Sequence, residues 1–186
     1  MEETNSNFSN NGHSHNGHDD SGTEWSTAPD NGESVLILYG TVTGNAEVLA
    51  EKLSAALRRV GLTARVHDMA HCQANLLTQA NCVLVVASTY GDGEPPDDAA
   101  PFWHAVVQGN GLNLNGVKFS VLALGNTTYD NFCKCGRDFD TALERHGATR
   151  IYRRVDCDVD YDDPAELWID GVVKSLAHDH RSAASA

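Results

Sequence analysis

Apolar positions along the chain follow two alternating patterns. Three continuous apolar runs are typical of strands that are buried on both faces, and they lie at residues 34–39, 82–88 and 118–124. Between and after these runs, apolar residues recur with the spacing of an amphipathic helix, over residues 46–60, 99–107 and 135–146. The chain is therefore predicted to alternate between strands and helices.

Weaker signals complete the pattern. Residues 63–68 and 149–153 predict two further strands, and residues 71–79 predict a short helix. A final helix has a strong start signal, with Asp163 as N-cap, Pro164 in the first turn and Glu166 three residues after the cap. Five strands in strict alternation with helices predict an α/β fold, a doubly wound sandwich in which helices cover both faces of a parallel sheet.

The two ends of the chain differ in composition from the rest. Residues 1–33 contain no Val, Ile or Leu and are rich in Asn, Gly, Ser, His and Asp, so they cannot bury enough apolar area to offset the entropy of ordering. We expect a disordered polar tail at 1–33, one folded domain at 34–177 and a short frayed end at 178–186.

The formal net charge of −13 argues against nucleic acid as a partner, because a phosphate backbone is bound by clustered Lys and Arg. Basic protein surfaces fit this charge better. No apolar run approaches the roughly 20 residues of a membrane span, and the polar N-terminus lacks a signal-peptide core. We therefore expect a cytoplasmic protein with no membrane span.

The five cysteines form no Cys-x-x-Cys pair and are odd in number. This spacing favours neither a disulfide framework nor a cysteine metal site, so reduced thiols and no metal are expected.

In a doubly wound sheet, ligands bind at the carboxyl ends of the strands, where the strand order reverses. Three loops leave strands at that edge and are expected to converge there: Gly40–Asn45, Thr89–Asp98 and Gly125–Asn131.

The first of these loops reads Gly40-Thr-Val-Thr-Gly-Asn45 and leads directly into a helix. Backbone N–H groups at a helix start are unpaired and lie at the positive end of the helix dipole, so together with the hydroxyls of Thr41 and Thr43 they can bind a phosphate. A loop that binds a nucleoside triphosphate contains a lysine, and this loop has none. It also lacks the Gly-x-Gly-x-x-Gly motif of a dinucleotide site, which argues against a pyrophosphate. A terminal monophosphate fits best, with an ordinary strand-to-helix turn as the alternative.

Each of the other two loops places one tyrosine beside glycines. Tyr90 precedes Gly91 and Gly93, and Tyr129 follows Gly125 by four residues. A tyrosine in this setting can lie flat against a planar ring, and the glycines let the backbone approach the edge of that ring. Two such tyrosines over a phosphate site predict a planar, phosphorylated cofactor.

Several motifs are distinctive: Ser88-Thr-Tyr-Gly-Asp-Gly-Glu-Pro-Pro, Leu124-Gly-Asn-Thr-Thr-Tyr, Phe132-Cys-Lys-Cys-Gly-Arg-Asp-Phe-Asp140 and Arg154-Val-Asp-Cys-Asp-Val-Asp-Tyr161. With them the chain resembles, over about Val35 to Leu176, the FMN-binding module of diflavin reductases, the group that includes the flavoprotein subunit of sulfite reductase, and more distantly free flavodoxins. The resemblance implies a flavodoxin-like three-layer sandwich whose five parallel strands have the order 2-1-3-4-5.

The resemblance also implies which residues contact FMN. Tyr90 and Tyr129 match the aromatics that flank the isoalloxazine, and Asp156 matches an acidic position beside the flavin. The complete set of predicted cofactor-binding residues is Thr41, Val42, Thr43, Gly44, Asn45, Ala46, Thr89, Tyr90, Gly91, Asp92, Gly93, Leu124, Gly125, Asn126, Tyr129, Phe132, Cys133 and Asp156. No catalytic acid or base is expected, because the cofactor carries the chemistry.

The expected function is that of an FMN-containing electron carrier, a redox protein that turns over only with partner proteins. By the resemblance, it takes electrons from a separate NADPH-dependent flavoprotein reductase and passes them singly to a haem, iron–sulfur or radical enzyme. No FAD or NADPH module follows Ala186 in this sequence, so we expect NADPH oxidation to need another protein.

Two alternatives stay open: an NADPH:quinone-type oxidoreductase on the same fold, and a flavin-free adaptor domain. A phosphorelay receiver is disfavoured, because that class needs an acidic pair after the first strand and an Asp at the end of the third, where this chain has Tyr39-Gly40 and Ser88-Thr89.

Overall fold

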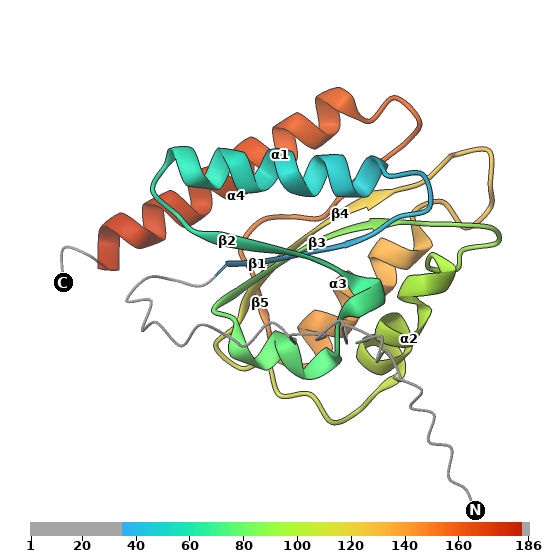
Figure 1. Ribbon diagram of the computed structural model, residues 1–186, viewed down its shortest axis with the longest axis horizontal. Helices are drawn as coiled ribbons and strands as arrows, with labels where there is room; N and C mark the ends of the chain where they lie inside the picture. Colours follow the sequence, from blue (N-terminus) through green and yellow to red (C-terminus); the bar gives the residue numbers. More distant parts are fainter. Residues whose placement is uncertain (1–34, 184–186) are drawn as a thin grey trace, which may run out of the picture.

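The computed structural model describes residues 35–183, which form a parallel sheet between two layers of helices (Figure 1). The sheet has strand order β2-β1-β3-β4-β5, as predicted, with β6 also paired to β4. The strands are β1 Val35–Gly40, β2 Ala64–Asp68, β3 Cys82–Ser88, β4 Lys118–Leu124, β5 Thr149–Arg150 and β6 Val155–Cys157. The predicted tail at 1–33 lies outside the described residues.

Within the part of the chain that the structure describes, four α-helices accompany the sheet: α1 Asn45–Arg59, α2 Ala100–Trp103, α3 Lys134–Arg145 and α4 Asp162–Ala183. Short 3-10 helices lie at Met69–His71, Ala74–Gln79 and Asp97–Ala99. Within residues 35–183, no helix is long and apolar enough to cross a membrane.

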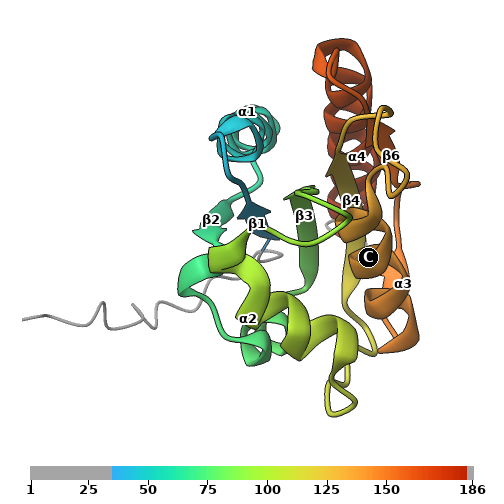
Figure 2. The ribbon, with the colours of Figure 1, turned by 90° about the vertical axis from the view of Figure 1, so that its right-hand side faces the viewer.

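Alternate residues of the central strands point into two separate cores. Leu36 and Leu38 pack in the core beneath α2 and α3, whereas Val35 and Ile37 pack in the core beneath α1 and α4. Figure 2, turned by a quarter, shows α1 and α4 on one side of the sheet and α2 and α3 nearer the other. Because both faces are covered, the central strands are continuous apolar runs.

The predicted helix over 99–107 is in fact two helical forms in series. After α2, residues His104–Gln108 form a π-helix. Two carbonyls of this segment accept hydrogen bonds from side chains at the end of α3. Arg145 Nη2 donates to the Val107 carbonyl at 2.6 Å, and His146 Nε2, from the residue after α3, donates to the Val106 carbonyl at 2.8 Å. The predicted short helix at 71–79 is likewise two 3-10 helices.

Of the predicted strand at 149–153, only the first two residues form a strand, β5; a further strand that was not predicted, β6, follows after a break, and both pair with β4. The Tyr152 carbonyl accepts a hydrogen bond from the Ser120 hydroxyl of β4 at 3.0 Å instead of from a backbone N–H, so the ladder is interrupted between the two strands. The last helix also differs at both ends. It begins at Asp162, with the Ala165 N–H donating to the Tyr161 carbonyl, and it continues to Ala183, beyond the predicted boundary at Ala177.

Candidate functional site

The strands that precede the three loops end at the same level of the sheet. In the parallel ladders Gly40 lies beside Ala87, Ser88 beside Leu124, and Leu124 beside Cys157. The loops therefore leave the sheet from one edge, and the Thr89 N–H donates to the Leu124 carbonyl at 2.8 Å, which joins the second loop to the third at its base.

The first loop, residues 41–44, leads into the start of α1. Gly44 has φ +87 and is the N-cap of α1, and its N–H donates to Thr41 Oγ1 at 2.9 Å, which closes the loop on itself. No side chain caps α1, so the N–H groups of its first turn have no side-chain partner within residues 35–183. The exposed Thr43 hydroxyl makes no hydrogen bond within residues 35–183, so it is available to a ligand together with those N–H groups.

A cavity of about 270 Å³ lies between the two tyrosine loops. It is lined by Thr89, Tyr90, Gly91, Asn126, Tyr129, Asn131, Phe132 and Cys133. Both tyrosines that border it are unusually open, with 54% of Tyr90 and 58% of Tyr129 exposed. Large aromatic side chains left open beside a cavity are typical of a site that stacks a planar ligand.

Two further hollows adjoin this cavity. One of about 260 Å³ shares Thr89 and Asn126 with it and reaches Asn45 at the start of α1. The other, of about 270 Å³, shares Tyr90 and reaches Thr41 and Val42. Together they connect the predicted phosphate loop with the tyrosine pair, so one elongated ligand can contact both.

The glycines of the second loop are required by its backbone. Gly91 has φ +50 and Gly93 has φ +110, conformations that other residues rarely adopt. The turn is closed by two hydrogen bonds to the Tyr90 carbonyl, from the Gly93 N–H at 3.1 Å and from the Glu94 N–H at 2.9 Å. A Cβ at Gly91 would lie 2.8 Å from the Glu94 carboxylate. The backbone at Gly91 therefore lines the cavity without a side chain.

Cys133 fixes the floor of the cavity. It has φ +55, the one positive φ at a non-glycine residue within the described chain, and its thiol donates to the Ala123 carbonyl at 3.3 Å. Burial, followed by the nearby Asp156 charge, raises the pKa of the Cys133 thiol to about 12. The thiol is thus neutral at physiological pH and is a structural group rather than a nucleophile.

Asp156 lies in β6 and lines none of the described cavities. Its carboxylate is paired with Arg154 Nε at 2.7 Å and with Arg137 Nε at 3.0 Å, so its charge is compensated by a residue of α3 and by the residue that precedes β6. Asp158, two residues further along, does border one of the hollows, and Asp97 and Asp98 border another. Asp158 accepts hydrogen bonds from the N–H and the hydroxyl of Thr127, and these bonds lower the pKa of the Asp158 carboxyl.

The structure brings most predicted site residues to the three connected hollows, namely Thr41, Val42, Asn45, Thr89, Tyr90, Gly91, Leu124, Gly125, Asn126, Tyr129, Phe132 and Cys133. Asp92 and Gly93 instead line a cleft of about 350 Å³ on the α2 side of the same loop. Thr43, Gly44 and Ala46 belong to the predicted phosphate loop and the first turn of α1, outside the described cavities.

Several cavity-lining residues were not predicted as cofactor-binding: Ser88, Pro96, Asp97, Asp98, Asn131, Asp158, Val159 and Tyr161. Most of them follow a predicted residue by a few positions in the same loop. Including each whole loop in the predicted site would therefore have found them. Val159 and Tyr161 lie in the loop after β6. The sequence pattern does not show β6 as a separate strand, and it is β6 that brings this loop to the cavities.

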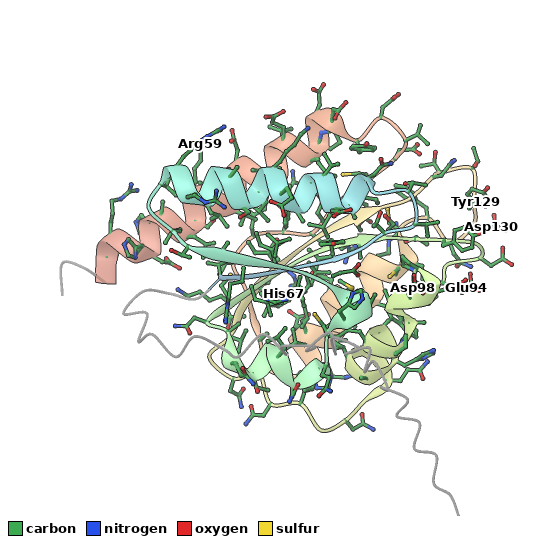
Figure 3. The ribbon with its side chains drawn as sticks, viewed as in Figure 1. Arg59, His67, Glu94, Asp98, Tyr129 and Asp130 are labelled. Carbon is green, nitrogen blue, oxygen red and sulfur yellow. The ribbon has the colours of Figure 1, made fainter. Side chains whose placement is uncertain are left out.

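Exposed carboxylates surround the site. Figure 3 shows Glu94, Asp98 and Asp130 at the same end of the molecule as Tyr129, with Arg59 at the opposite end. Within residues 35–183, these three carboxylates form no ion pair. We call Asp92, Glu94, Asp97, Asp98 and Asp130 the acidic rim; all five are exposed.

Comparison with known proteins agrees with this geometry. The sulfite reductase (NADPH) flavoprotein alpha-component of Bacillus subtilis (strain 168) is 44% identical over 149 residues, which are 80% of this chain and 25% of that protein. The same component from Thiocapsa roseopersicina is 38% identical over 152 residues, 81% of this chain and 29% of that protein. The chain therefore spans about a quarter of the length of these relatives.

Solved structures give the same result for the fold. The flavodoxin of Streptococcus pneumonia TIGR4 superimposes with a TM-score of 0.71 at 31% identity and covers 78% of this chain and 99% of that one. A mutant of the flavodoxin from Pseudomonas aeruginosa gives a TM-score of 0.67 at 26% identity, with 77% and 98% coverage. The family model described as flavodoxin matches residues 37–168, which include all three loops. The chain belongs to the flavodoxin family.

Proposed function

We propose that this domain binds one FMN and relays single electrons between two partner proteins. The observation that carries the proposal is the pair of open tyrosines, Tyr90 and Tyr129, on either side of a cavity that continues to the uncapped start of α1. A planar ring and a terminal phosphate match the two ends of this site. Bound FMN would supply the redox chemistry, since it accepts and returns electrons one at a time.

The phosphate would be held by the loop 41–44. The N–H groups of the first turn of α1 and the hydroxyls of Thr41 and Thr43 are neutral donors, which favour a phosphate monoester over an exposed triphosphate. The Thr41 oxygen already accepts a bond from Gly44 N–H, and within residues 35–183 its own proton is given to no acceptor, so it can be donated to a ligand. Because this bond closes the loop, its donors would already be in place when the phosphate binds.

The ring would be held between the tyrosines. Their rings give area for stacking, and the backbone around Gly91 and Asn126 can pair with polar atoms on the ring edge. The one thiol that lines this cavity, Cys133, is buried and protonated, so it is not placed to act as a nucleophile. The chain's part is to bind, orient and shield the cofactor.

The relatives suggest the partners. The Bacillus subtilis protein is named as the flavoprotein component of an NADPH-dependent sulfite reductase, and the chain matches one quarter of it. We propose an NADPH-dependent flavoprotein reductase as the donor and a haem, iron–sulfur or radical enzyme as the acceptor. The acidic rim beside the cavity would steer basic surfaces of these partners towards the ring edge.

Visible absorption of the purified full chain, together with identification of the released flavin, tests the proposal. The expected result is a flavin spectrum with FMN near one per chain, and no oxidation of NADPH by the protein alone. A protein that cannot be loaded with FMN is the result expected of a flavin-free adaptor. Rapid NADPH-dependent quinone reduction by the chain alone is the result expected of the oxidoreductase. Either result would overturn the proposal.

A further inference from the structure

A single side-chain hydrogen bond connects the tips of the two tyrosine loops. Asn131, which follows Tyr129 by two residues, donates from Nδ2 to the backbone carbonyl of Asp92 at 2.6 Å. The two residues are 39 positions apart in the sequence. Because Asp92 lies in the turn that begins at Tyr90, this bond ties one ring-flanking loop to the other.

Packing reinforces this connection. A Cβ placed on Gly93 would lie 2.8 Å from Cβ of Asn131 and 2.7 Å from Cδ of Lys134, so the turn is seated directly against the residues that begin α3. Lys134 is itself held in place by Asp138, at 2.5 Å, and by the Trp103 ring, whose centroid is 5.7 Å from Nζ. The Lys134 side chain behind the turn therefore has two partners that hold it in place.

The remaining links between the loops lie at their base. The Thr89 N–H donates to the Leu124 carbonyl, and the Thr89 hydroxyl accepts from the Cys135 N–H at 3.2 Å. Within the described chain, the bond from Asn131 is the one hydrogen bond between the tip of the second loop, 91–93, and the third loop. The tip depends on this side chain to keep its distance from Tyr129.

We propose that Asn131 is a positioning residue that sets the width of the slot between Tyr90 and Tyr129. This role rests on the proposed binding of FMN. Asn131 itself lines the cavity, so it holds the slot at the width at which both rings contact a planar ligand. Without its amide, the turn at 91–93 is free to move away from the third loop, and the slot opens.

Two variants test this role in the full chain. Asn131→Ala removes the amide, and Asn131→Asp keeps the size of the side chain but replaces its donor with an acceptor. Asn131→Gln retains the donor and is the rescue variant. The matched control is Asn113→Ala, since Asn113 is an exposed asparagine whose side chain makes only a local bond, to the Asn115 N–H at 3.1 Å.

The first readout needs no flavin. In the apoprotein, amide hydrogen exchange at Gly93 and Glu94 is expected to be about 3- to 12-fold faster in Asn131→Ala and Asn131→Asp, the range expected from losing one neutral hydrogen bond. Asn131→Gln is expected to regain part of the protection, and Asn113→Ala to match the parent. Unchanged exchange at both amides in Asn131→Asp would overturn the proposal, even if Asn131→Ala folds poorly.

The second readout is flavin binding. FMN and riboflavin are both expected to bind about 3- to 12-fold more weakly to Asn131→Ala, because the defect concerns the ring and not the phosphate. The fluorescence of the bound flavin is expected to rise, since tyrosine contact quenches it. Parent-like affinity and fluorescence in Asn131→Ala would overturn the role. If the parent chain binds no FMN, the proposed function fails, while the exchange measurement still decides whether Asn131 clamps the loops.

Discussion

The indole Nε1 of Trp168 donates to the hydroxyl of Ser120 at 2.9 Å in the core between α4 and the sheet. Both side chains are fully buried, and the Ser120 hydroxyl in turn donates to the Tyr152 carbonyl, where β5 and β6 separate. The Ser120 hydroxyl is therefore the hydrogen-bond partner both of a buried indole on α4 and of the carbonyl at the break between β5 and β6.

We predict that Ser120→Ala lowers the free energy of unfolding by about 1–3 kcal/mol, because the buried indole N–H and the Tyr152 carbonyl both lose their partner. Urea unfolding of the apoprotein measures this loss. Ser182→Ala, at an exposed serine near the end of α4, is the control and is expected to change stability by no more than about 0.5 kcal/mol. Equal stability of the two variants would contradict the assignment.

The split of the last strand also shows how far the sequence pattern reaches. β3 and β4 match their predicted ranges because each is a continuous apolar run in the middle of the sheet. The segment after Thr149 lies at the edge of the sheet, where a side-chain hydroxyl can replace a backbone partner without any change in hydropathy. The pattern of hydrophobic residues therefore could not predict the break between β5 and β6.

The same limit applies to the site. Glycine and tyrosine in the loops after β3 and β4 were sufficient to predict the cavity between them. The role of Asp156 was not predictable in the same way, since Asp156 and Asp158 are both acidic and two positions apart. The strand ends at Cys157, so Asp156 stays beside Arg137 and Arg154 while Asp158 reaches the level of the loops.

Thr43→Ala is expected to weaken FMN binding by about 1–3 kcal/mol, because the phosphate loses a charge-assisted hydrogen bond. Riboflavin lacks the phosphate, so its affinity is expected to stay unchanged, and Thr43→Ser is expected to keep parental FMN affinity. Fluorescence titration with both flavins measures the difference. An equal loss for FMN and riboflavin would move Thr43 away from the phosphate.

The buried thiol of Cys133 predicts a dependence of stability on pH. Its pKa is raised from 9.0 to about 12 in the folded chain, mainly by burial, so the folded state binds the proton more tightly than the unfolded state does. This contribution is complete below pH 9 and is lost as the pH rises from 9 towards 12, at about 1.4 kcal/mol per pH unit.

Serine does not titrate in this range, so Cys133→Ser isolates the effect. The stability difference between the parent and Cys133→Ser is expected to be constant from about pH 6 to 8 and to shift against the parent above about pH 9. Urea unfolding at each pH provides the measurement. A difference that stays constant up to about pH 10.5 would mean that the thiol is not shielded as the structure shows.

The acidic rim predicts salt-dependent encounters. Replacing Asp97 and Asp98 by Asn is expected to slow reduction of a basic cytochrome c, used as a probe, several-fold at low salt, because steering by exposed charges acts on the encounter rate. The difference is expected to vanish at about 1 M salt, where screening acts over about 3 Å. Stopped-flow mixing across a salt series measures it.

Asp170→Asn is the control for this experiment, since Asp170 is an exposed carboxylate on α4 beside Lys174, outside the acidic rim. It removes the same kind of charge and is expected to leave the rate close to that of the parent. A rate that is flat across the salt series, or an equal loss in the control, would show that the rim does not guide docking.

The central claim is that one FMN sits between Tyr90 and Tyr129 and exchanges electrons singly. Stepwise reductive titration of the FMN-loaded full chain, followed by visible absorption, tests it most directly. We predict one flavin per chain and two separate one-electron steps. A single two-electron step, or no flavin retained by a folded protein, would contradict the account.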